Sequence, residues 1–97
     1  MESWWLIRLG MLLMWARLRV RDAGTAEVLD GDGRTLNYDS EDSARAALLD
    51  AGFIAFDGLD EEDAMTLGVS LDELTPPQGE DDDRLIQRMT QRLGHMA

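Results

Sequence analysis

The chain has 97 residues and contains no cysteine, no lysine, one histidine and two prolines. Without cysteine there are no disulfides and no thiolate metal ligands, and nothing indicates a redox compartment. The one histidine, His95, is third from the end of the sequence, in a stretch expected to fray. No serine or threonine stands in a recognisable nucleophile motif, and no glycine-rich phosphate loop is present. We therefore expect no catalytic residue, no cofactor and no metal, and interpret the chain as non-enzymatic.

Positive charge is also scarce. The chain has 20 acidic residues against nine arginines, and its formal net charge is −11. Residues 1–21 carry four arginines and one acid, a net charge of +3, so the remaining residues carry −14. An acidic body repels the phosphate backbone, so direct nucleic-acid binding is not expected. The charge remains compatible with a basic protein partner or with solubility alone.

Long apolar runs are missing as well. The most apolar stretch begins at Trp4, contains Arg8 and is thirteen residues long, too short to span a bilayer. Residues 1–13 are predicted to be an apolar N-terminal arm or helix; Gly10 weakens the helix, and the alternative pairs the arm into the sheet. Exposed tryptophans at Trp4 and Trp5 would need a cover, either the body of the protein or a second copy, and we predict a homodimer through this segment. Met11 and Met14 could also be alternative translation starts, which would make the first residues a dispensable extension.

Residues 14–77 are predicted to be an α+β core domain that begins with three antiparallel strands. Apolar and polar residues alternate from Met14 to Arg21, which indicates a strand with one face on the core and one in water. Turn residues then separate two further strands, Ala26 to Asp30 and Arg34 to Tyr38. The arginines on the wet face are expected to meet Glu27 or other acids across the sheet.

An amphipathic helix is predicted after this meander. Asp39 or Ser40 caps its N-terminus, and Gly52 ends it. Its apolar stripe consists of Ala44, Ala47, Leu48 and Ala51. Phe53 to Phe56 indicates a fourth strand. The predicted fold class is α+β: a small antiparallel sheet, a three-strand meander plus a fourth strand, packed with helices mainly on one face.

The rest of the chain is predicted to be helical and acidic. Asp60 to Leu67 indicates a short helix, and a further helical turn begins at Ser70. Residues 78–97 are interpreted as an acidic linker and a C-terminal amphipathic helix. That helix covers roughly Asp82 to Leu93, and its apolar stripe consists of Leu85, Met89 and Leu93.

Small size, acidity and the amphipathic last helix favour a protein-interaction module: a regulator, an adaptor, or an inhibitor of the antitoxin or immunity type. One alternative is a DNA mimic that blocks a basic nucleic-acid-binding protein; another is a carrier modified at Ser70. The residues expected to contact a partner are the N-terminal tryptophans, the first acidic run and the arginines of the last helix: Trp4, Trp5, Asp60, Glu61, Glu62, Asp63, Arg84, Arg88 and Arg92.

The carrier alternative comes from the segment Gly68–Leu74, which slightly resembles the phosphopantetheine attachment site of acyl carrier proteins. In that family the serine follows an aspartate and opens a long helix, whereas here Val69 precedes Ser70 and Pro76 follows soon after. A capping box between Ser70 and Glu73 also accounts for these residues.

A longer pattern, DGRTLNYDSEDSARAALLDAGFIAFDGLDEEDA, resembles that of small, functionally unassigned acidic proteins of proteobacteria. The resemblance covers about residues 14–77. It implies a cytoplasmic bacterial domain and transfers no active site.

Overall fold

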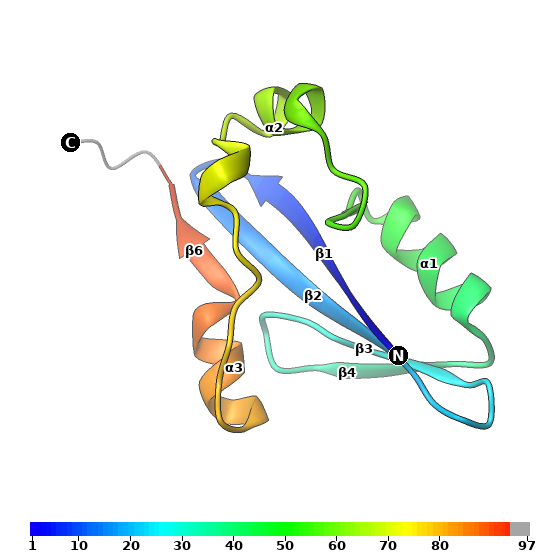
Figure 1. Ribbon diagram of the computed structural model, residues 1–97. Coiled ribbons are helices and arrows are strands. Elements are labelled where there is room, and N and C mark those ends of the chain that lie inside the picture. Colours follow the sequence, from blue (N-terminus) through cyan, green and yellow to red (C-terminus); the bar gives the residue numbers. More distant parts are fainter. Residues whose placement is uncertain (94–97) are drawn as a thin grey trace.

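The computed structural model describes residues 1–93 and has the α+β fold that the sequence predicts (Figure 1). Within residues 1–93, an antiparallel sheet of six strands is packed with three α-helices and one short 3₁₀-helix. The strands are β1 (Glu2–Leu9), β2 (Leu12–Val20), β3 (Ala26–Leu29), β4 (Thr35–Tyr38), β5 (Ile54–Ala55) and β6 (Thr90–Arg92). The helices are α1 (Glu41–Asp50), α2 (Glu61–Leu67), the 3₁₀-helix η1 (Leu71–Glu73) and α3 (Asp82–Arg88).

The N-terminal arm is a strand of this sheet. It forms a hairpin with β2, in which Trp5 lies opposite Ala16 and Leu9 lies opposite Leu12. Gly10 has φ of 61° in the turn, a left-handed conformation that glycine adopts without a steric penalty. Of the two expectations for residues 1–13, the sheet alternative is therefore correct, and the helical stripe does not form. Because β2 begins at Leu12, the expected boundary at residue 14 falls inside a strand.

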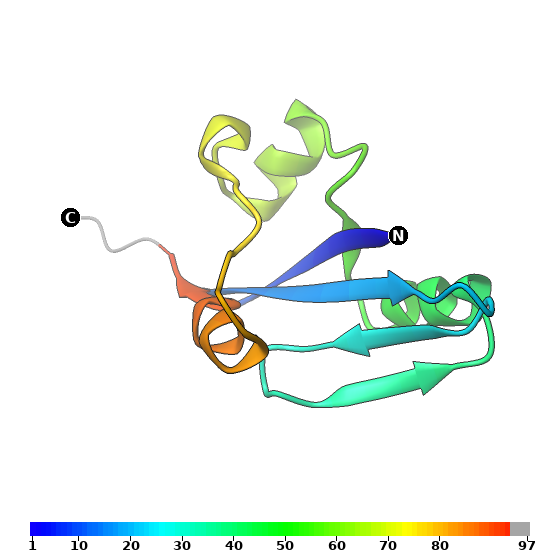
Figure 2. The same ribbon diagram turned by 60° about the horizontal axis from the view of Figure 1, so that its bottom comes forward.

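The strand order is β4-β3-β2-β1-β5, and β6 is a further neighbour of β2. β3 pairs with Arg17–Val20 of β2, and β6 pairs with Leu12–Met14. Because β1 occupies the other side of β2, β3 and β6 lie one after the other along the same side of this strand (Figure 2). β3 and β6 together thus pair with the side of β2 that faces away from β1.

The predicted last helix is shorter than expected. α3 ends at Arg88, and the next residues form β6 instead of the five further helical residues that were predicted. Leu85 and Met89 are buried as predicted. After Met89, the β-branched Thr90 and its neighbours gain backbone hydrogen bonds with the half of β2 that β3 leaves open. Tertiary pairing therefore overrides the helical pattern.

Helices lie on both faces of the sheet but mainly on one, as predicted: residues of α2, of α3 and next to η1 pack on one core cluster, and α1 packs on the other. Figure 2 shows α1 behind the strands and α3 in front of them. α1 packs on a cluster that includes Trp5, Ala16 and Leu18, whereas α3 packs on Leu6, Leu13 and Trp15. The face of β2 that the alternation predicts to be wet is consequently buried at Trp15, because this large apolar side chain requires a cover of its own.

α1 itself agrees with the prediction. The Ser40 hydroxyl accepts a hydrogen bond from the Ser43 backbone N–H at 3.1 Å, and Ala44 and Leu48 are buried. After the helix, Gly52 has φ of 97°. The Arg45 guanidinium lies 5.1 Å from the centroid of the Trp5 ring, which places its charge over the ring face.

Candidate functional site

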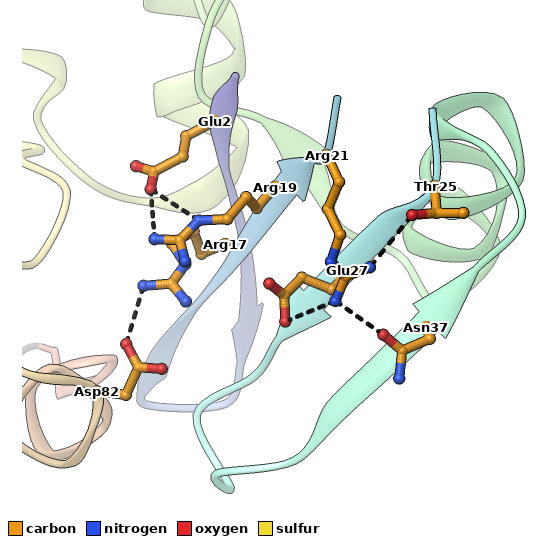
Figure 3. A network of polar contacts seen from close by, with 8 residues as sticks. All are labelled: Glu2, Arg17, Arg19, Arg21, Thr25, Glu27, Asn37 and Asp82. Carbon is orange, nitrogen blue, oxygen red and sulfur yellow. Dashed lines mark hydrogen bonds and ion pairs between the residues drawn. The ribbon is translucent and has the colours of Figure 1, made fainter. Parts of the chain in front are cut away.

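Each face of the sheet has a part that no helix covers, and the two uncovered parts differ in chemistry. On the α3 side the uncovered part is polar (Figure 3). Arg19 donates two hydrogen bonds to the Glu2 carboxylate, at 3.1 and 2.7 Å. Arg21 lies 3.5 Å from Glu27 and donates to Asn37 at 3.1 Å. The arginine row therefore meets acids across the sheet, as predicted.

The Glu2 carboxylate raises the pKa of the Arg19 guanidinium above its ordinary value, because it accepts hydrogen bonds from the charged group. Arg17 differs from its neighbours in being only 5% exposed. It donates to Asp82 of α3 at 3.2 Å (Figure 3). Its Nε is buried and has no hydrogen-bond partner among the described residues, and the same is true of Trp15 Nε1. This ion pair fastens α3 to the sheet.

The uncovered part on the α1 side is apolar and forms a groove of about 300 Å³. We call it the apolar groove. The sheet contributes Ile7, Leu9, Met14, Ala16, Val28, Leu36 and Tyr38; α1 and the residues after it contribute Ala47, Leu48, Ala51 and Phe53; and the β3–β4 turn contributes Asp30, Asp32 and Arg34.

The position of α1 creates this groove. The helix follows β4 in the chain, and its C-terminal end reaches β1, where Gly52 adjoins Ile7. The apolar residues between α1 and the hairpin turns are left uncovered, and Leu9 and Leu36 are 53% and 45% exposed. Alanines at positions 47 and 51 keep the helical wall of the groove low. The result is an open apolar strip beside a helix.

Charged residues close one end of the groove. Asp30 Oδ1 accepts hydrogen bonds from the backbone N–H groups of Asp32 and Arg34, which holds the β3–β4 turn. The Arg34 guanidinium lies 3.2 Å from the Asp30 carboxylate and 3.9 Å from that of Asp32. Two carboxylates against one guanidinium leave this end negative.

The structure corrects the role predicted for the N-terminal tryptophans. Trp5 is 1% exposed and Trp4 is half-buried. Trp4 packs edge-on against Trp15, with 6.2 Å between the ring centroids. These side chains belong to the two cores of the chain itself, since β1 has helices on both faces. A homodimer through other residues of the N-terminal segment stays a prediction.

The acidic runs lie at helix starts. Asp60 caps α2 by accepting from the Asp63 backbone N–H at 2.9 Å, and Glu61, Glu62 and Asp63 form the first turn. Asp81 caps α3 in the same way. Carboxylates at these positions stabilise the helix dipole, so both runs have a structural role.

The arginines of the predicted last helix do not form one basic row. Arg84 lies 3.9 Å from Glu80, and Arg88 donates to the Gln78 backbone carbonyl at 2.7 Å. Arg92 lies on β6, beyond the end of the helix. Because α3 ends at Arg88, Arg92 does not continue the four-residue helical spacing of Arg84 and Arg88.

Ser70 also differs from expectation. It precedes η1, a 3₁₀-helix of three residues, and its side chain makes no capping hydrogen bond. The predicted capping box with Glu73 is therefore absent. Ser70 lines a cleft of about 320 Å³ together with Glu73, Gln91 and Arg92.

Sequence reasoning missed the apolar groove. It assigned Met14 to the core face of β2 without asking how much of that face one helix can cover. The sequence did contain a signal for it. The apolar stripe of a single ten-residue helix, made mostly of alanines, is too narrow to cover the apolar face of four strands.

Comparisons with protein-family models, with curated proteins and with solved structures found no match. Within residues 1–93, no cluster of three or more histidine or acidic residues is arranged to hold a metal ion. In the same part of the chain, no helix has the length and apolarity needed to cross a membrane.

Proposed function

We propose that this chain is a non-enzymatic protein-interaction module, of the regulator, adaptor or inhibitor type, that binds a protein partner in the apolar groove. The observation that carries the proposal is the contrast between the two uncovered parts of the sheet. One part carries paired charges, as solvated sheet surfaces do. The other exposes leucines beside a helix. Exposed apolar strips with charged rims are typical of protein-binding surfaces.

The charge of the molecule supports a basic partner. With a net charge of −11, electrostatic attraction accelerates the approach of a cationic protein and makes its binding salt-dependent. The resemblance to acidic bacterial proteins favours an interaction in the cytoplasm. A DNA mimic or a carrier modified at Ser70 would not need the groove.

The test is an affinity pull-down from the organism that encodes the chain, at low and high salt. The bait is the full chain, a groove variant, Leu9→Ser/Leu36→Ser, and a control variant, Leu49→Ser/Met65→Ser. The control removes two leucine-sized side chains that are 59% and 78% exposed and do not line the groove. Circular dichroism of all three baits checks that they are folded.

We expect one stoichiometric protein that the full chain and the control retain and the groove variant loses. Retention of that protein by the groove variant would contradict a groove interface. Displacement of the partner by duplex DNA would point to the mimic, and a mass increase on Ser70 without a retained partner would point to the carrier.

A further inference from the structure

We propose that the element bound in the apolar groove is an amphipathic α-helix of the partner, with cationic side chains beside its apolar stripe. This inference rests on the proposed function and identifies the partner's secondary structure and charge. The reasons are the dimensions of the groove, the strands that it crosses, and the charge at its end.

The space along β1 fits a helix. Trp5 lies under α1, and Leu9 lies at the far end of the groove. Four residues of a strand span about 13 Å. Packed helices have axes about 8–10 Å apart, and small residues at the contact permit the shorter distance. The alanines at positions 47 and 51 face the groove, so a second helix has room to lie beside α1 on the sheet.

The groove also extends too far across the sheet for a strand. Its lining runs from Leu36 on β4 to Leu9 on β1, across three strand-to-strand spacings of about 4.8 Å. Leu36 is level with Ser3 of β1, so Leu9 also lies six residues, about 20 Å, further along the strands. The diagonal is about 24 Å, close to the length of 16 helical residues. A peptide strand added to the free edge of β4 would cover Leu36 and leave Leu9 and Ile7 exposed. A helix covers all three.

Charge argues against a second copy of this chain as the occupant. Two molecules of charge −11 repel each other, and the end of the groove formed by Asp30, Asp32 and Arg34 is itself negative. A helix with lysines or arginines beside its apolar stripe complements this end and is attracted by the molecule as a whole.

Three 18-residue synthetic peptides test the inference with the full chain. The first has leucines at helical spacing and lysines on the other face. The second has the same composition with leucine and lysine alternating, as in a strand. The third has the helical order with glutamates in place of the lysines. Binding is measured by titration of ¹⁵N-labelled protein, together with the Leu9→Ser/Leu36→Ser and Leu49→Ser/Met65→Ser variants.

We expect the first peptide to bind at least tenfold more tightly than the other two, with shifts at Ile7, Leu36 and Ala47. We expect the groove variant to weaken it at least tenfold and the control variant to leave it unchanged. Preference for the alternating peptide, equal binding to the groove variant, or binding of the acidic peptide would each overturn the inference. So would a dimer or a bound lipid found by native mass spectrometry and lost in the groove variant.

The two proposals fail separately. If the helical peptide does not bind while the pulled-down partner still depends on Leu9 and Leu36, the helix inference is wrong and the interaction module stands. If no partner depends on these residues, the proposed function is wrong whatever the peptides do.

Discussion

Arg17 shows how one side chain organises its surroundings. Its guanidinium is buried under α3, and its one carboxylate partner in the described part of the chain is Asp82, whose own side chain is 63% exposed. Removing either partner has unequal consequences. A solvated aspartate tolerates the loss of its arginine, whereas a buried guanidinium without a carboxylate retains its full desolvation cost.

We expect Asp82→Ala to lower the free energy of unfolding by about 1–2 kcal/mol, because it leaves Arg17 unpaired. Arg17→Met, which replaces the charge by an apolar side chain of similar length, should cost less. Urea unfolding of both variants measures the difference. Asp83→Ala is the control, since Asp83 is also in the first turn of α3. If Asp82→Ala and Asp83→Ala lower the free energy of unfolding equally, Asp82 contributes only through the helix dipole, and the ion pair with Arg17 adds no stability.

Gly68 has two reasons to be glycine. Its φ is 73°, and a Cβ there would displace the end of the flexible Arg8 side chain, which would give up its hydrogen bond to the Leu67 backbone carbonyl at the end of α2. We expect Gly68→Ala to cost more than the ~1–2 kcal/mol of left-handed strain alone. Gly10→Ala isolates the strain, because Gly10 has φ of 61° and a Cβ added there would have no neighbour within 4 Å. Similar melting temperatures for Gly68→Ala and Gly10→Ala would show that displacing Arg8 adds no cost to the left-handed strain.

At the scale of elements, the meander and α1 were predictable because their signals are local. Alternation defines β2, and the Ser40 cap with its apolar stripe defines α1. β6 was not predictable, because Thr90–Arg92 continues a helical pattern and becomes a strand only where β3 leaves part of β2 free. β1 was ambiguous for a related reason: with core on both faces, its apolar run has neither a helical nor a strand period.

The stripe of α1 gives a direct test at this scale. Leu48→Asp should unfold the chain or destabilise it by several kcal/mol, since it places a carboxylate in the core beside Trp5. Leu49→Asp, at the next position and 59% exposed, should change stability by less than about 1 kcal/mol. Thermal melting followed by circular dichroism compares them. Equal melting temperatures would mean that the buried face of α1 is assigned incorrectly.

At the scale of the whole molecule, the apolar groove depends on relations that no local pattern contains. It exists because α1 crosses the sheet from β4 to β1 and leaves apolar residues of four strands uncovered. The partner residues predicted from sequence were chosen for their type, and the structure assigns several of them to capping and core packing. The missing information was geometric.

The position of β1 predicts the effect of truncation. We expect a chain that begins at Met14 to be unfolded, because it loses Trp5, Leu6 and the strand between β2 and β5. The near-ultraviolet circular dichroism signal of the tryptophans should disappear, and urea unfolding should lose its cooperativity. A cooperative transition in the truncated chain would show that residues 1–13 are dispensable.

The arrangement of β3 and β6 along one side of β2 also orders events during synthesis. β6 pairs with Leu12–Met14, so 76 or more residues separate the partners in the chain. At about 5–20 residues per second, the ribosome adds residue 92 roughly 4–16 s after residue 14. Until residues 85–89 have been added, the nascent chain carries Leu13 and Trp15 without Leu85 and Met89 to cover them. α3 and its C-cap thus end the exposure of the first hairpin to chaperones just before the strand that completes this side of β2 is made.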